Sequence, residues 1–202
     1  QLIPEDVLLE VLAGEKVVSR GGIKLDPALE IFNIDVTGLT VLDAGASTGG
    51  FTDCLLQRGA KRVHAVDVGY GQFHQKLRGD PRVTLYEKTN VRTLQPELLG
   101  EKVDLVVADL SFISLTKVVS ALKGCLKNEG VMVLMVKPQF ELGPGEAKKG
   151  VVRSPELRQR AVQQVKERLS ELGLCVTGET PSPILGPKGN QEFFLKIVCA
   201  SS

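Results

Sequence analysis

Short apolar runs alternate with longer amphipathic stretches along most of this chain, and this alternation constrains the fold more than any other feature. The longer stretches place apolar side chains every three or four residues, the spacing of a helix with one buried face. They predict helices at Gly50–Arg58, at Leu115–Leu126 and at Pro155–Leu172, the last with Ser154 as its N-cap. Short runs that alternate with helices indicate βαβ units, in which crossover helices join parallel strands.

The short runs predict seven strands: Thr40–Ala44, Arg62–Asp67, Val83–Glu87, Val103–Ala108, Val131–Val136, Leu174–Glu179 and Glu192–Val198. The central runs are apolar at both alternating sets of positions, as expected for parallel strands with helices on both faces. The last two runs are separated by a segment with three prolines, two glycines and no helical pattern, so these strands are expected to be antiparallel neighbours. We therefore predict an α/β fold with a seven-stranded, mostly parallel sheet and an antiparallel last strand, the outline of a Rossmann-like class I methyltransferase.

The residues before the first strand predict a small separate unit. Residues 1–33 are expected to form an N-terminal helical segment or linker, with short helices at Pro4–Leu12 and Pro27–Phe32. Between these helices, the segment Arg20–Lys24 contains two glycines and two cations and is expected to form a turn. Residues 34–202 contain all seven predicted strands and are expected to form the main domain.

Composition excludes several classes of protein. The 25 basic and 24 acidic residues nearly cancel, so the total charge gives no sign of a protein that coats nucleic acid. The longest apolar run, Val131–Val136, is far shorter than the roughly 20 residues that span a bilayer, and no signal segment opens the chain. We expect a cytoplasmic protein without a membrane partner. The four cysteines lie far apart and the two histidines have no third ligand at a suitable spacing, so no metal site is expected.

A glycine-rich loop follows the first predicted strand in the segment VLDAGASTGGFTDCLL. Its spacing, G-x-x-x-G-G, differs from the G-x-G-x-x-G pattern of dinucleotide-binding folds. Asp43 ends this strand and suits a cationic amine, while Asp67 ends the next strand and can accept both hydroxyls of a ribose. A nucleoside with an amino-acid tail has both groups, so S-adenosylmethionine is the expected cofactor; the alternative is that the two acids only cap loops.

The candidate cofactor-binding residues come from the ends of four strands and the loops that follow them. They are Asp43, Gly45, Ser47, Gly49, Gly50, Phe51, Asp67, Asn90 and Asp109. Asn90 follows the third strand, where it could contact the adenine base or cap the next short helix.

Two charged side chains follow the fourth and fifth predicted strands. They are Asp109 in ADLSFIS and Lys137 in MVKPQFE. Since open α/β sheets bind their ligands at the carboxyl ends of the strands, the two side chains are expected to be neighbours at the ligand site. They could form a catalytic pair or only a structural ion pair.

The charged motifs resemble a known family. The order Lys24, Asp109, Lys137 and Glu192 resembles the Lys-Asp-Lys-Glu tetrad of FtsJ-type ribose 2′-O-methyltransferases. The motifs VSRGGIKL, LDAGASTGGFTD, NVR, DLSFISL, VKPQFE and GPKGNQE are similar to the TlyA (hemolysin A) family of ribosomal RNA methyltransferases. The resemblance implies S-adenosylmethionine as donor and a ribose in ribosomal RNA, that of cytidine, as acceptor. TlyA-like proteins usually carry an S4-type RNA-binding domain, which would lie upstream of Gln1, and FtsJ-like enzymes commonly have a proline at the position of Thr48.

Chemistry assigns roles to the tetrad. A ribose hydroxyl holds its proton tightly, so the enzyme must make that oxygen nucleophilic. We expect Lys137 to help the hydroxyl ionise and to stabilise the developing alkoxide. Asp109 would orient Lys137, Glu192 would fix the two lysines, and Lys24 would steady the nucleotide.

The local charge distribution predicts where RNA binds. Residues 137–168 contain eight basic and four acidic side chains, whereas the first 33 residues contain three and six. The RNA-binding candidates are Arg20, Lys148, Lys149 and Arg153. Phe51, Phe112 and Phe140 could stack on a base, but core packing is the expected role.

Two other functions compete with the methyltransferase hypothesis. The TlyA family has carried the hemolysin label, which suggests a membrane-active protein, although no apolar run here is long enough to insert. A nucleotide-binding domain of other chemistry, such as an NAD-dependent dehydrogenase, is the second. The oligomeric state and the RNA target stay open.

Overall fold

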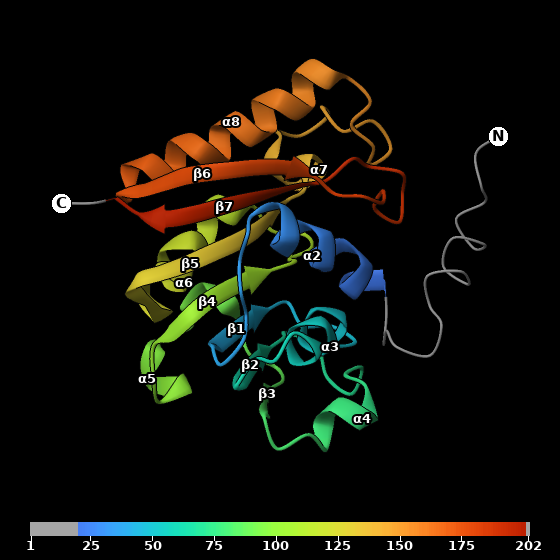
Figure 1. Ribbon diagram of the computed structural model, residues 1–202. Coiled ribbons are helices and arrows are strands. Elements are labelled where there is room, and N and C mark those ends of the chain that lie inside the picture. Colours follow the sequence, from blue (N-terminus) through green and yellow to red (C-terminus); the bar gives the residue numbers. More distant parts are fainter. Residues whose placement is uncertain (1–19, 201–202) are drawn as a thin grey trace.

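The structure, a computed structural model, describes residues 20–200, in which seven strands form one sheet (Figure 1). The strands are β1 Thr40–Ala44, β2 Arg62–Val66, β3 Val83–Tyr86, β4 Val103–Ala108, β5 Leu126–Val136, β6 Leu174–Pro181 and β7 Phe193–Cys199. The helices are α2 Arg20–Ile31, α3 Gly50–Gln57, α4 Gln75–Arg78, α5 Pro96–Leu99, α6 Val119–Cys125, α7 Pro138–Glu141 and α8 Pro155–Glu171, with short 3-10 turns η1 Val91–Thr93 and η2 Leu115–Lys117. The predicted helix at Pro4–Leu12 lies outside the described residues.

The strand order is β3-β2-β1-β4-β5-β7-β6, and β7 is antiparallel to both of its neighbours. The other pairs are parallel, so the prediction of a mostly parallel sheet with an antiparallel last strand is confirmed. From β1 the chain first adds β2 and β3 on one side and then crosses to add β4 on the other side, so the strand order reverses between β1 and β4. Open α/β sheets bind their ligands at such a point.

Each face of the sheet has its own apolar core, as the side chains that alternate along the strands require. Leu42 and Ala44 of β1 point into the core shared with α6 and α8, whereas Val41 points into the core shared with α2 and α3. In Figure 1, α2 and α3 lie in front of the strands and α6 lies behind them. The sheet is thus covered on both faces, as predicted.

The segment Arg20–Lys24 is a helix, so the prediction of a turn there is wrong, and α2 starts before Pro27. Close packing explains the difference. A Cβ atom on Gly21 would lie 3.2 Å from the Cα atom of Gly50, so the missing side chain lets α2 touch the start of α3. Leu25 and Leu29 are fully buried in the same contact, which offsets the low helix propensity of glycine.

The direction of β7 decides which of its ends lies at the ligand edge of the sheet. Parallel strands β1, β2, β4 and β5 all end at one edge, and the antiparallel β7 begins there. Val136 pairs with Phe193, so Lys137 and Glu192 are next to one another along this edge. Residues more than fifty positions apart in the sequence therefore meet at one site.

Phe194 provides a test of the core on the α2 side. It is fully buried on β7, and its ring centroid lies 6.2 Å from that of Phe51. We expect Phe194→Ala to lower the free energy of unfolding by about 3–5 kcal/mol, because it removes apolar contacts and leaves a cavity. Ile31→Ala, at a side chain that is 64% exposed, should change it by less than about 0.5 kcal/mol. Urea unfolding of both variants measures this, and equal losses would contradict the assignment of the core.

Candidate active site

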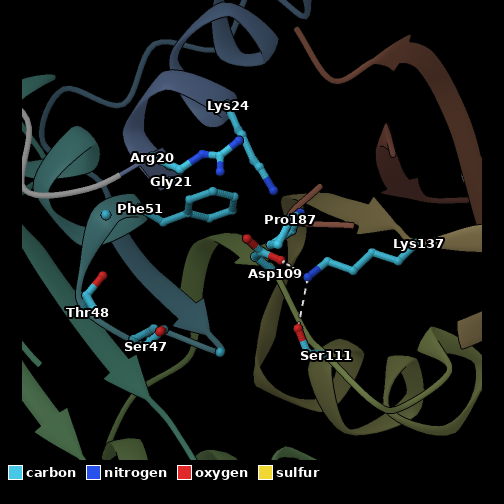
Figure 2. Close-up of a pocket in the computed structure, with 13 residues that line it drawn as sticks. Arg20, Gly21, Lys24, Ser47, Thr48, Phe51, Asp109, Ser111, Lys137 and Pro187 are labelled. Atoms are coloured by element: carbon cyan, nitrogen blue, oxygen red, sulfur yellow. Dashed lines mark hydrogen bonds and ion pairs between the residues drawn. The ribbon is translucent and has the colours of Figure 1, made fainter. Parts of the chain in front are cut away.

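A cavity of about 360 Å³ lies at the carboxyl edge of the sheet, between α2, the loop after β1 and the ends of β4 and β5. We call it the reaction cavity. Its charged lining consists of Arg20, Lys24, Asp109 and Lys137, and Figure 2 shows these side chains converging from α2 and from the two strand ends. The sequence-predicted residues of α2, β4 and β5 are thus brought together.

Lys137 and Asp109 form an ion pair at the floor of the reaction cavity. Lys137 Nζ lies 2.5 Å from Asp109 Oδ1 and also donates a hydrogen bond of 3.1 Å to Ser111 Oγ (Figure 2). The lysine side chain is 9% exposed and the aspartate side chain 22% exposed. The amine is therefore held to one loop by an ion pair and by one hydrogen bond, that to Ser111, because Asp109 Oδ1 itself has no hydrogen-bond partner.

Lys24 and Glu192 form a second, deeper ion pair. Lys24 Nζ donates a hydrogen bond of 2.7 Å to Glu192 Oε2, and Glu192 is fully buried. Lys24 lines the reaction cavity, whereas Glu192 lies behind it. The other carboxylate oxygen, Oε1, is buried without a hydrogen-bond partner, and Gly186 leaves space for it, since a Cβ atom there would lie 2.6 Å from Oε1. The four tetrad residues therefore form two ion pairs at one edge of the sheet.

A second cavity, of about 540 Å³, adjoins the first and is called the cofactor cavity here. Both cavities are lined by Gly45, Ser47, Asp109 and Ser111. The remaining lining residues include Asp67 and Asn90, from the ends of β2 and β3. A ligand in this cavity can therefore reach Asp109 at the shared wall, whereas Lys137 lines only the reaction cavity.

Asp67 presents a fixed carboxylate to the cofactor cavity. It accepts hydrogen bonds from the backbone N–H groups of Ser47 (2.8 Å) and Gly69 (2.6 Å) and from the amide of Gln72 (3.0 Å). One of these three bonds goes to Oδ2 and two go to Oδ1, so Oδ2 keeps the greater capacity to accept hydroxyl donors from a ligand.

The glycine loop has a left-handed backbone at Gly45, at Ser47 (φ 49°) and at Gly49. Gly45 has φ +86°, and a Cβ atom there would lie 2.5 Å from the carbonyl oxygen of Asp109. Gly49 has φ +99° and is the N-cap of α3, where a Cβ atom would lie 2.4 Å from Leu77. Glycine at these two positions thus brings the loop close to the end of β4 and to α4, and Gly45 forms part of the wall shared by the two cavities.

Asp43 and Gly49 are the two candidate cofactor residues that line neither cavity. Asp43 is fully buried beneath the loop and accepts a hydrogen bond of 2.7 Å from the Thr52 hydroxyl. Burial raises the pKa of its carboxyl to about 7, although the bond from Thr52 opposes the shift. Its Oδ1 has no hydrogen-bond partner. Contact between this carboxyl and a cationic amine stays a prediction.

Asn90 and Phe51 each combine two of the expected roles. The Asn90 side chain accepts a hydrogen bond of 3.0 Å from the N–H of Arg92, which caps η1, and it also lines the cofactor cavity. Phe51 is buried in the core but forms part of the wall of the reaction cavity. Capping and ligand contact are compatible for Asn90 in this geometry.

A comparison with models of known protein families identifies the family of this chain. The model of the FtsJ-like methyltransferase family matches residues 17–198, which include both cavities and all four tetrad residues. This chain belongs to the FtsJ-like methyltransferase family.

Three relatives of this FtsJ-like chain cover most of its length. A Mycobacterium tuberculosis protein named 16S/23S rRNA (cytidine-2′-O)-methyltransferase TlyA is 56% identical over 179 residues, which are 88% of this chain and 67% of that protein. Hemolysin A of Brachyspira hyodysenteriae is 40% identical over 192 residues, 94% of this chain and 80% of that protein. The solved structure of a protein described as a hemolysin from Streptococcus thermophilus is 42% identical, with a TM-score of 0.90, and covers 94% of this chain and 70% of that one.

Two observations bear on the competing hypotheses for this FtsJ-like chain. Among residues 20–200, each helix is too short or too polar to cross a membrane. The same part of the chain has no group of three or more histidine, cysteine, aspartate or glutamate side chains placed to hold a metal ion.

The predicted RNA-binding residues of the FtsJ-like chain fall into two places. Arg20 lines the reaction cavity and donates a hydrogen bond of 3.4 Å to the carbonyl oxygen of Leu185. Lys148, Lys149 and Arg153 are exposed on the loop between α7 and α8, outside the reaction cavity. Asn190 anchors that loop, since its side chain bonds to the N–H of Val152 (2.9 Å) and to the carbonyl oxygen of Gly150 (2.8 Å).

Core packing is the wrong expectation for Phe112. Its side chain is 88% exposed beside the cofactor cavity, and its backbone has φ 62°, in the left-handed region. Its ring centroid lies 5.2 Å from that of Phe140. The turn imposed by this backbone directs the ring out of the sheet core, which an apolar residue in DLSFISL does not reveal.

Sequence reasoning also missed three uncharged or distant contributors. Ser111 binds Lys137, Gln72 binds Asp67, and Glu141 binds the loop after β4 through Ser114 Oγ (2.6 Å) and the N–H of Leu115 (2.8 Å). Burial raises the pKa of Glu141, although these two bonds favour its ionised form. Ser111 could have been predicted from the DLSFIS motif, because a residue two positions after Asp109 in a loop can lie at the same site as Asp109.

The buried carboxyl of Asp43 makes the free energy of unfolding depend on pH. Because its pKa in the folded state lies near 7, above the ordinary 3.8, the folded protein binds this proton more tightly than the unfolded chain does between these values. Stability contributed by the neutral carboxyl is therefore lost as the pH rises through 7. Relative to Asp43→Asn, we expect the wild-type free energy of unfolding to fall by roughly 4 kcal/mol between pH 4 and pH 8.

Urea titrations at several pH values, without ligand, measure this difference. Glu97→Gln, at an exposed carboxyl of α5, is the matched control and should parallel the wild type. Parallel curves for the wild type and Asp43→Asn would contradict the raised pKa.

Proposed function

We propose that this FtsJ-like protein transfers a methyl group from S-adenosylmethionine to the ribose 2′-hydroxyl of a cytidine in ribosomal RNA. One observation carries the proposal: Asp109, ion-paired with Lys137, lies at the wall shared by a cavity suited to a nucleoside and a cavity lined by cations. The name of the Mycobacterium tuberculosis relative supports the choice of cytidine and of ribosomal RNA.

The cofactor cavity has groups that fit each part of S-adenosylmethionine. Asp67 Oδ2 can accept ribose hydroxyls, and Asn90 lies with apolar side chains where a base would lie. Gly45 and Ser47 allow the methionyl part to follow the backbone toward the shared wall. When bound there, the cofactor supplies a methyl group whose bond to sulfur breaks, with the electron pair kept by sulfur, as a bond to the ribose oxygen forms.

Lys137 is the residue that makes the ribose oxygen nucleophilic. As a neutral amine it accepts the proton of the 2′-hydroxyl, and as an ammonium group it stabilises negative charge on that oxygen. Asp109 holds the amine beside the shared wall through their ion pair. The proton then leaves to water through the open side of the reaction cavity.

The second ion pair and the surface cations would bind the RNA. Lys24, fixed by Glu192, and Arg20 line the reaction cavity and are placed to contact phosphate or ribose oxygens. Lys148, Lys149 and Arg153 would contact the backbone further from the target nucleotide. The exposed ring of Phe112 is available to stack on a base, as single-stranded RNA recognition requires. A ribosomal substrate, as free RNA or as an assembled subunit, places the protein in the cytoplasm.

The decisive assay is the transfer of labelled methyl groups from S-adenosylmethionine to ribosomal subunits that lack the modification, followed by mapping of the modified sugar. We expect label on a cytidine 2′-oxygen. Lys137→Ala should lower the rate at least 100-fold, because general base catalysis contributes typically 10²–10⁴-fold. Lys137→Arg should not restore it, because a guanidinium group keeps its proton.

Cofactor binding separates a chemical defect from misfolding in these variants. Calorimetry with S-adenosylhomocysteine should give nearly the wild-type affinity for Lys137→Ala, and Lys117→Ala, at an exposed lysine of η2, should keep both binding and turnover. A Lys137→Ala protein that turns over at the normal rate would refute the role of Lys137, and label on a base rather than a sugar would refute the proposed reaction.

Asp67 tests the cofactor assignment. We expect Asp67→Asn to weaken the affinity for S-adenosylhomocysteine at least tenfold, because hydrogen bonds to a charged acceptor contribute about 1.5–3 kcal/mol. Asp80→Asn, at a carboxylate paired with Arg82 outside both cavities, should bind normally. The wild type should not bind NAD at comparable concentrations. Tight binding of NAD would favour the dehydrogenase alternative instead.

A further inference from the structure

We propose that the loop 142–154 between α7 and α8 and the connector 182–192 between β6 and β7 together form one binding site for the phosphate backbone of the substrate RNA. In this site Lys188 of the connector acts with Lys148 and Lys149 of the loop, and the buried side chain of Asn190 holds the two segments together. The inference rests on the proposed function only in that the substrate is an RNA. It adds Lys188, which is not among the sequence-predicted RNA-binding residues, and it gives Asn190 a positioning role.

Asn190 fastens the loop to the connector through both ends of its amide. Its side-chain oxygen accepts a hydrogen bond of 2.9 Å from the N–H of Val152, and its nitrogen donates one of 2.8 Å to the carbonyl oxygen of Gly150. Asn190 is 2% exposed, so water competes little for these bonds. Arg158 of α8 binds the carbonyl oxygen of Val152 (2.9 Å) and fixes the same segment from the helix side. The loop and the connector, which lie side by side in Figure 1, are therefore held in one arrangement.

The two lysines of the loop lie in a tight turn. Lys149 has φ 54° and Gly150 has φ 78°, and the N–H of Val151 donates a hydrogen bond of 3.1 Å to the carbonyl oxygen of Lys148. Two successive residues with positive φ are typical of turns in which glycine and asparagine predominate. The turn itself therefore does not account for a lysine at position 149. Both lysine side chains are exposed, so the turn presents two adjacent cations to solvent.

Lys188 brings a third cation to the same turn. Its side chain lies across the open face of Gly150, since a Cβ atom on that glycine would lie 3.4 Å from Lys188 Nζ and 3.6 Å from its Cδ atom. Lys188 is exposed, and within residues 20–200 none of the three lysines forms an ion pair. The carboxylate of the loop, Glu146, pairs with Arg160 instead. Because these cations lack carboxylate partners, the surface fits a ligand that carries several negative charges, such as a nucleic-acid backbone.

The connector places this site beside the reaction cavity. Pro187, which directly precedes Lys188, lines that cavity (Figure 2). Two positions after Asn190, Glu192 accepts the hydrogen bond of 2.7 Å from Lys24. One short segment thus carries a cation of the site, the tie to the loop and the carboxylate of the second ion pair. A phosphate bound at the turn would lie at a fixed distance from a ribose in the reaction cavity, and phosphate contacts set the register of a nucleic acid in this way.

The salt dependence of binding counts the phosphate contacts. Filter binding of the full chain to ribosomal subunits that lack the modification, and to protein-free ribosomal RNA, gives Kd between about 50 and 200 mM KCl. We expect Lys188→Ala to flatten the slope of log Kd against log salt by about 0.7–0.9 and to weaken binding roughly fivefold at about 0.1 M salt. Replacing Lys148 and Lys149 together by alanine should flatten the slope by about twice as much. Lys117→Ala, at an exposed lysine of η2, should keep the wild-type slope.

Asn190→Ala removes no charge, so its effect reports the position of the turn. We expect the KM for subunits to rise roughly fivefold, with kcat and the affinity for S-adenosylhomocysteine unchanged, because a freed turn must be ordered when the RNA binds. In this background the double lysine substitution should weaken binding much less than it does in the wild type, a non-additive result that a general loss of stability does not give. Gln191→Ala is the matched control. The Gln191 amide binds carbonyl oxygens of Ser182 and Glu192 and not the loop, so this variant should keep the wild-type KM.

The outcomes separate this inference from the proposed function. Unchanged salt slopes in Lys188→Ala, or lysine effects that add in full to that of Asn190→Ala, would overturn the site. So would an Asn190→Ala protein that no longer binds S-adenosylhomocysteine, since the residue would then serve the fold as a whole. Losses seen with subunits but not with protein-free RNA would indicate a ribosomal protein as the partner, which also contradicts the proposal. A wild type that shows these slopes but methylates no ribose would refute the proposed function and leave the RNA site in place.

Discussion

The ion pair between Lys24 and Glu192 makes the rest of the site depend on the docking of α2. Glu192 is fully buried, and without Lys24 it would be an unpaired charge in the protein interior, which costs several kcal/mol. The carboxylate is held at the sheet edge by β7, and the lysine is delivered by α2, which touches α3 at Gly21 and Gly50. A buried pair adds little net stability by itself, but this one makes an undocked α2 unfavourable. The reaction cavity is therefore complete only when the first and last parts of the described chain are both in place.

The same pair explains how three cations share one small cavity. Glu192 pairs with Lys24 and Asp109 pairs with Lys137, so each of the two lysines lies beside a carboxylate. A near-neutral total charge is consistent with this arrangement, because the cations act at one place and not over the whole surface.

The sheet could be predicted almost strand by strand, because parallel strands covered on both faces are continuous apolar runs that no loop imitates. The antiparallel β7 followed from the helix-free connection before it. The N-terminal part could not be predicted in the same way. Gly21 and Gly22 indicate a turn by local propensity, yet Gly21 serves a close contact with Gly50, which lies far away in the sequence. Tertiary packing determines the conformation of this segment, and the local sequence does not reveal that packing.

The residues of the site also fall into those that the sequence could predict and those that it could not. Charged residues at strand ends were identifiable, because a charge after a buried strand must lie at the sheet edge, and the topology collects those edges. Ser111, Gln72 and Glu141 are set instead by how loops return on one another: Glu141 reaches Ser114 across 27 positions of sequence. Phe112 points outward for the same reason, since its left-handed backbone turns the loop. The strands thus decide which charges meet, whereas the loops decide how each charge is oriented, and orientation is what a proton transfer requires.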